Sequence, residues 1–187
     1  MMLSPKSAPS LLRAHIGATV ALAALFAALI AVPAYAADAM AGQTVVLKAA
    51  DATKSLPTSV FYRGQTAPVQ SRNSGGVHFA DGMLMLVTNV DNSGYSSGVQ
   101  QKFTAYLMTE VPLDIQGKHL PAGAYGIGFM GGQLYVTDIG AHDLLVVKGA
   151  SDADMKRPVP LQVVADTAAD HYRVYAGREY FVFSRAK

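Results

Sequence analysis

Hydrophobic and polar residues alternate along most of the chain after residue 57, and turn residues interrupt the alternation at short intervals. Alternation with a period of two is typical of β-strands that bury one face. Short strands with turn signals about every 8 to 12 residues are typical of sandwiches and barrels. We therefore predict an all-β, single-domain antiparallel β-sandwich of about nine or ten short strands, with a β-barrel as the alternative.

The predicted strands are rich in β-branched and aromatic residues and lie between turns. They are Ser59–Tyr62, Val77–Phe79, Met83–Val87, Gln100–Val111, Leu113–Ile115, His119–Leu120, Tyr125–Phe129, Gln133–Asp138, Leu144–Lys148, Leu161–Ala165, His171–Tyr175 and Glu179–Arg185. Pro68 limits Gln65–Gln70 to an edge strand or a turn, and Asn73–Gly76 is a predicted turn. Ser151–Arg157, which Pro158 ends, predicts a helical turn.

Position within these strands also predicts the core. Gln100–Val111 alternates over the longest stretch and carries apolar residues on both faces, which favours a central strand. Nine residues are predicted to be largely buried: Leu86, Phe103, Leu107, Tyr125, Ile127, Tyr135, Val146, Val163 and Phe181. Gly75-Gly76 and the pair Gly126 and Gly128 do not open a helix, as a phosphate-binding loop would require, and are predicted to be hairpin and close-packing glycines.

Residues 1–36 have the pattern of a secretory signal peptide. Lys6 and Arg13 supply a positive start, residues 16–32 carry no charge, and Ala34-Tyr35-Ala36 gives a small-x-small cleavage pattern. The alternative is a membrane anchor, but the uncharged run is shorter than the about 20 residues of a spanning helix. We expect cleavage after Ala36, no stable membrane span in the cleaved protein, and a periplasmic or secreted location in a bacterium-like cell.

The segment that follows, residues 37–57, is predicted to be loosely ordered, with Thr44–Lys48 able to pair as an edge strand. The β domain is expected over residues 58–187. Cysteine is absent, so neither disulfides nor a lipid-modified cysteine can be present. The formal charge of +2 is that of Lys6 and Arg13, and the remaining chain is neutral, which argues against a nucleic-acid partner and a polybasic membrane surface.

Two polar clusters are candidate sites. In the first, Arg63, Gln65, Gln70 and Arg72 lie close to Tyr62 in the sequence. Guanidinium and amide groups beside an aromatic ring suit carboxylates or polar polymers, provided that the two arginines approach one another across a hairpin. Solvent-exposed strand ends are the alternative interpretation of this cluster.

The second cluster comprises Asp138, His142 and Asp143, between two predicted strands. Asp and His can ligate a cation or act as a base and its orienting partner. The simpler interpretation, which we favour, is that the two aspartates accept backbone N–H bonds in a loop. The histidines lack metal-ligand spacing, and no nucleophile motif is present, so we predict neither a metal nor a cofactor.

The segment Gly117–Ile127 contains Leu-x-Ala-Gly-x-Tyr at residues 120–125. This segment resembles one found in exported bacterial β-sandwich domains of unknown function. The resemblance covers only these residues and implies a sandwich exposed to the cell envelope, with no catalytic residue to transfer.

These observations favour an exported, non-enzymatic binding or envelope-accessory module. Its partner would be a small molecule, an envelope polymer or a protein. One alternative is a small exported hydrolase that uses Asp138, His142 or His171. Another is a carrier of a hydrophobic ligand, if the fold is a closed barrel.

Overall fold

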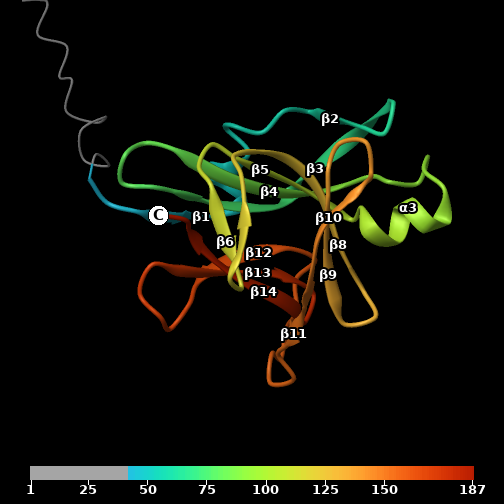
Figure 1. Cartoon of the computed structure of the whole chain (residues 1–187). Coiled ribbons are helices and arrows are strands. Elements are labelled where there is room, and N and C mark those ends of the chain that lie inside the picture. The colour runs from blue at the N-terminus through green and yellow to red at the C-terminus, as the bar shows by residue number, and fades with distance from the viewer. Residues whose placement is uncertain (1–41) are drawn as a thin grey trace, which may run out of the picture. The chain divides into compact units, whose positions relative to one another are not determined.

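The computed structural model describes residues 42–187, so the predicted signal peptide and residues 37–41 lie outside the described residues. Short turn-bounded segments form fourteen strands and two short helices in this part of the chain (Figure 1). In chain order they are β1 Val45–Leu47, α2 Ala49–Ala52, β2 Ser59–Tyr62, β3 Gln65–His78, β4 Leu84–Val90, α3 Ser97–Lys102, β5 Ala105–Thr109, β6 Leu113–Ile115, β7 Lys118–Leu120, β8 Gly123–Met130, β9 Gln133–Thr137, β10 Asp143–Lys148, β11 Ala150–Ser151, β12 Gln162–Ala165, β13 His171–Ala176 and β14 Glu179–Arg185.

The strands form two antiparallel sheets. The 8-stranded sheet has the order β1-β3-β4-β5-β8-β9-β10, with β2 paired to β3. The 6-stranded sheet has the order β12-β13-β14-β6-β7, with β11 paired to β14. Each sheet ends in edge strands and neither closes on itself, so the predicted all-β sandwich is confirmed and the barrel alternative is wrong. The strand count exceeds the prediction because a short strand such as β11, with two residues, carries too few positions to show alternation.

Alternating apolar residues of both sheets fill the space between them. Met85 and Leu107 of the first sheet and Phe181 of the second are completely buried, and Phe183 beside them is almost so. Seven of the nine predicted core residues are buried: Leu86, Phe103, Leu107, Tyr125, Ile127, Val163 and Phe181. Tyr135 is only partly buried and Val146 is 43% exposed, because they form a cross-strand pair on the face of β9 and β10 that points away from the second sheet.

A second hydrophobic core lies on the outer face of the first sheet, under the β2–β3 hairpin and α3. The fully buried Tyr62 ring stacks on Phe103 with centroids 3.7 Å apart. A side chain on Gly126 of β8 would lie 2.5 Å from this ring, and one on Gly128 would lie 2.8 Å from the backbone of α3. The two glycines therefore allow the hairpin and helix to approach β8, as the sequence predicted.

The first three residues of the predicted strand Gln100–Val111 are instead the end of helix α3, and the strand itself begins at Ala105. Val99 and Phe103 are about one helical turn apart and both are buried in the second core, so the helix packs this face against the sheet. The side-chain amide of Asn92 donates to the Gln100 and Phe103 carbonyls at 3.0 and 2.6 Å. These bonds satisfy carbonyls that the end of a helix leaves free, so a distant residue stabilises the helix end.

Two further local predictions are wrong. Asn73–Gly76 lies within β3, where residues 74–76 pair with β4. A side chain on Gly75 would lie 3.1 Å from Val163 of β12, so this glycine allows the second sheet to approach, whereas one on Gly76 would meet β4 of the same sheet. Ser151–Arg157 forms no helix, since Ser151 pairs with β14 instead. In contrast, Thr44–Lys48 contains the predicted edge strand, β1.

Candidate functional site

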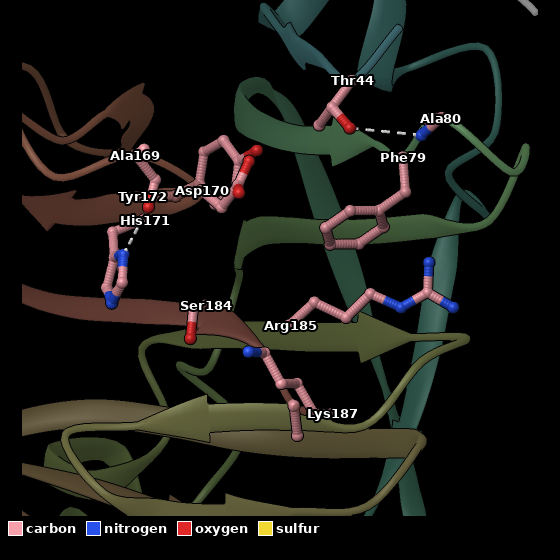
Figure 2. Close-up of a pocket in the computed structure, with 11 residues that line it drawn as sticks. Thr44, Phe79, Ala80, Ala169, Asp170, His171, Tyr172, Ser184, Arg185 and Lys187 are labelled. Atoms are coloured by element: carbon pink, nitrogen blue, oxygen red, sulfur yellow. Dashed lines mark hydrogen bonds between the residues drawn. The ribbon is translucent and has the colours of Figure 1, made fainter. Parts of the chain in front are cut away.

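A cavity of about 580 Å³ opens at the end of the sandwich, where the β3–β4 turn, the β12–β13 turn and the residues after β14 meet. We call it the sandwich-end pocket. It is lined by Thr44, Phe79, Ala80, Ala169, Asp170, His171, Tyr172, Ser184, Arg185, Ala186 and Lys187. Figure 2 shows Phe79 and Arg185 on one side, His171 on the other, and Ser184 and Lys187 between them. Its volume lies within the usual range for small-molecule sites, about 300–1,000 Å³.

Two aromatic rings form the apolar part of the pocket. Phe79 and Tyr172 are 4% and 8% exposed and meet edge to face, with centroids 6.4 Å apart. Both rings belong to the inter-sheet core, and burial raises the pKa of the Tyr172 phenol. The rings are therefore held in place by packing on their inner sides, and their pocket-facing edges offer an apolar contact.

Arg185 supplies the main positive charge. Its guanidinium lies 5.5 Å from the centre of the Phe79 ring, and one nitrogen donates to Asp81 at 2.6 Å. The hydrogen bond from Arg185 holds the pKa of Asp81 below its usual value, so Asp81 is ionised at neutral pH. A guanidinium has five N–H donors, and the others have no hydrogen-bond partner among residues 42–187.

The opposite wall is polar. His171 Nδ1 lies 2.7 Å from the Ala169 carbonyl, and because a carbonyl only accepts, Nδ1 carries the proton in this contact. Asp170 has a positive φ of 58°, a conformation that Asp tolerates better than most residues. The Ser184 hydroxyl and the Lys187 ammonium make no hydrogen bond to another described residue. This wall can therefore donate to, and accept from, a ligand.

The first predicted cluster does not form one site. Arg63 lies at the tip of the β2–β3 hairpin with φ of 46°, and its backbone N–H donates to the Ile139 carbonyl at 2.6 Å. Arg72 lies far along β3, next to α2. Since Gln65 and Arg72 are seven residues apart in one strand, they are separated by roughly 23 Å at about 3.3 Å per residue. The approach of the two arginines that the hypothesis requires does not occur.

The other members of this cluster have local roles. Tyr62 is completely buried in the second core. Gln65 donates to the Gly94 carbonyl at 3.4 Å and Gln70 to the Val90 carbonyl at 3.3 Å. These amides hold the loop after β4 against the hairpin. Only Tyr62 and Arg63 line a common cavity, of about 190 Å³, together with Lys102 and Thr137.

In the second cluster, Asp138 accepts backbone N–H bonds in a loop, as the simpler interpretation predicted. Its Oδ1 accepts the backbone N–H groups of Gly140 and His142 at 2.8 and 2.9 Å, and its Oδ2 lies 2.9 Å from His142 Nδ1. The backbone bond from His142 is the main reason that the pKa of Asp138 is lowered. Asp143 forms an ion pair with Lys102, at 2.6 Å. The loop therefore uses its carboxylates to hold its own backbone and α3.

The three residues of the hydrolase alternative are not brought together. Asp138 and His142 lie between β9 and β10 of the first sheet, whereas His171 begins β13 of the second and lines the sandwich-end pocket. Within residues 42–187, no group of three or more His, Asp or Glu side chains has the geometry of a metal site. The sequence did not identify Phe79, Tyr172 or Arg185 as site residues, because the groups that meet at this pocket are far apart along the chain. Asp81 and Arg185, for example, are 104 positions apart.

Comparison of the chain with protein-family models, with curated proteins and with solved structures found no match. Function is therefore argued from the pocket itself.

Proposed function

We propose that this chain is an exported, non-enzymatic binding module, and that the sandwich-end pocket is its ligand site. One observation carries the proposal: the packed rings of Phe79 and Tyr172 form an apolar surface beside the Arg185 guanidinium, whose N–H groups other than the one bonded to Asp81 have no partner in the described chain. Binding pockets commonly combine an apolar surface with a few polar groups that fix the ligand's orientation. Within the described residues, this pocket combines both features at a suitable volume.

The ligand class follows from these groups. Phe79 and Tyr172 suit a ring or a short apolar body, while Arg185 and Lys187 suit a carboxylate or a phosphate. The Ser184 hydroxyl can add a neutral hydrogen bond. We therefore expect a small amphipathic anion.

The absence of a catalytic arrangement in the pocket supports a binding role. A serine nucleophile needs a base within hydrogen-bond reach that a third group orients. His171 Nδ1 instead contacts the Ala169 carbonyl, and no hydrogen bond joins His171 to Ser184 in the described chain. The hydrophobic-carrier alternative required a closed barrel, and both sheets are open.

Export rests on the sequence of residues 1–36 and on the physical character of the remaining chain. None of the helices in residues 42–187 has the length and apolar character needed to cross a bilayer. Core packing and strand pairing hold the fold without cysteines, so the domain can fold in an oxidising compartment without disulfide chemistry. The signal-peptide pattern of residues 1–36 is what supports a periplasmic or secreted location in this proposal.

Binding of phenyl phosphate, measured by ligand-observed NMR and calorimetry, tests the site. Arg185→Gln and Lys187→Ala should each weaken binding by about tenfold, which corresponds to one lost charge-assisted contact. Asp81→Asn should strengthen it, because the carboxylate that competes for Arg185 is removed. Lys118→Ala, at an exposed lysine of β7 outside the pocket, is the matched control.

Phenol, which lacks the anionic group, should bind more weakly than phenyl phosphate. Phenyl phosphate affinity that is the same in all four variants, or no binding at all, would overturn the proposed site.

A further inference from the structure

A bulge interrupts the pairing of β3 with β4. Gln70 and Ser74 pair with consecutive residues of β4, so residues 71–73 between them have no partner on that strand. Bulges bend a strand and redirect its side chains, and they are common next to active sites. Arg72 lies in the middle of this bulge, so its direction is set by the bulge rather than by the alternation of β3.

Hydrogen bonds hold the bulge in its shape without the help of Arg72. The Ser71 carbonyl accepts the Ser74 hydroxyl at 2.6 Å, and it also accepts the hydroxyl of Thr53, at the end of α2, at 3.2 Å. The Arg72 guanidinium makes no hydrogen bond or ion pair to another residue in the part of the chain that the structure describes. Its five N–H donors are therefore available to a ligand.

Arg72 lines two adjoining cavities, of about 340 and 260 Å³, which also share Ala49 at the start of α2. We call them together the bulge groove, and it lies between α2, the bulge and residues 159–164. Lys48 adds a second positive charge to the larger cavity. None of the residues that line the two cavities is acidic, and none of them lines the sandwich-end pocket. The groove therefore favours an anion.

The larger cavity has an aliphatic wall. Leu161 and Val163 are 5% and 7% exposed and belong to the core between the sheets, while the nearby Val159 is 39% exposed. Core packing thus fixes the inner part of the wall, and Val159 leaves apolar surface open to a ligand. No aromatic residue lines either cavity, in contrast to the sandwich-end pocket, so the groove offers an aliphatic contact without a ring for stacking.

We propose that the bulge groove is a second ligand site, which binds a medium-chain aliphatic carboxylate. The carboxylate lies at Arg72, whose planar guanidinium can donate two parallel bonds to it. Lys48 contributes a second positive charge, and the aliphatic chain lies along the wall that contains Val159. The inference is independent of the proposed function, because the two sites share no lining residue.

Binding of octanoate to the cleaved protein, measured by calorimetry and ligand-observed NMR, tests this site. Arg72→Gln should weaken octanoate binding by about tenfold, because one charge-assisted contact is lost. Val159→Asp places a negative charge on the aliphatic wall and should weaken it by at least about tenfold. Acetate, which lacks the chain, and octan-1-ol, which lacks the charge, should each bind at least about tenfold more weakly than octanoate.

Arg157→Gln is the matched control, since it removes the same charge at an exposed arginine that lines neither cavity. It should leave octanoate binding unchanged. Arg185→Gln should also leave octanoate binding unchanged, and Arg72→Gln should not alter phenyl phosphate binding, so failure of one site is distinguishable from failure of the other. An octanoate affinity that falls only in Arg185→Gln, equal effects of the substitutions at residues 72 and 157, or no octanoate binding would overturn the inference.

Discussion

Replacement of Tyr62 by alanine tests whether the second core holds the β2–β3 hairpin on the sheet. The Tyr62 ring is completely buried and stacks on Phe103. The backbone of β8 at Gly126 lies directly beneath the ring. Strand β8 is paired on both sides and cannot collapse into the space that the ring leaves. The decrease in the free energy of unfolding should therefore lie near the upper values for such substitutions. We expect a decrease of about 3–5 kcal/mol in the free energy of unfolding.

Tyr62→Phe separates the hydroxyl from the ring. Since the Thr137 hydroxyl donates to the Gly126 carbonyl at 3.1 Å, the Tyr62 hydroxyl donates to Thr137 Oγ1, at 2.6 Å. Phenylalanine removes this one buried hydrogen bond and keeps the stacking. The expected loss is about 0.5–1.5 kcal/mol.

Phe61 is the matched control, because it is the neighbouring residue of β2 and is 53% exposed. Phe61→Ala should change the free energy of unfolding by no more than about 0.5 kcal/mol. Urea unfolding followed by circular dichroism and tyrosine fluorescence gives all three values. A loss below about 1 kcal/mol for Tyr62→Ala, or equal losses at residues 61 and 62, would refute the reasoning.

Three further predictions concern the main core, acid stability and export. Leu107→Ala should cost about 2–5 kcal/mol in urea unfolding, because its side chain is completely buried between the sheets; a negligible change would contradict the assigned facing of β5. A backbone N–H bond from Thr167, with the Arg173 ion pair, lowers the pKa of Asp166 in the folded protein. Its contribution to stability is therefore complete above the unfolded pKa of about 3.9 and is lost as pH falls from that value through the lowered folded-state pKa. Asp166→Asn should therefore reduce the difference in urea midpoint between neutral and acid pH, and an unchanged difference would contradict this assignment. Intact-mass analysis of the exported protein should give an N-terminus at Ala37, and a mass that retains residues 1–36 would disprove cleavage.

Local turn chemistry made the sheet architecture largely predictable from the sequence. Gln116-Gly117 and Gly131-Gly132 adopt positive φ at both positions, as two-residue hairpin turns require, and each joins the strands that the sequence placed beside it. Asn73–Gly76 carried a similar signal, but its glycines lie in a strand, where Gly75 allows contact between the sheets and Gly76 allows close approach of β4. A single sequence does not distinguish these two uses of glycine.

The candidate site was far less predictable. Arg63 and Arg72 are close in sequence, and the extended backbone of β3 separates them. Phe79 and Arg185 are distant in sequence, and the packing of the two sheets brings them within 5.5 Å. Alternation predicts which face of a strand is buried, but it does not predict which strand ends meet across the sandwich.

The position of β14 has a consequence for the order in which the chain can fold. β14 joins β13 to the β6–β7 hairpin, so Arg185 pairs with Leu113 and Phe183 with Ile115 across a long stretch of intervening sequence. Until β14 is available, the β6–β7 hairpin has no other strand of its sheet to pair with. Contacts of such high sequence separation form slowly, so the 6-stranded sheet can be completed only after the last strand of the chain has become available.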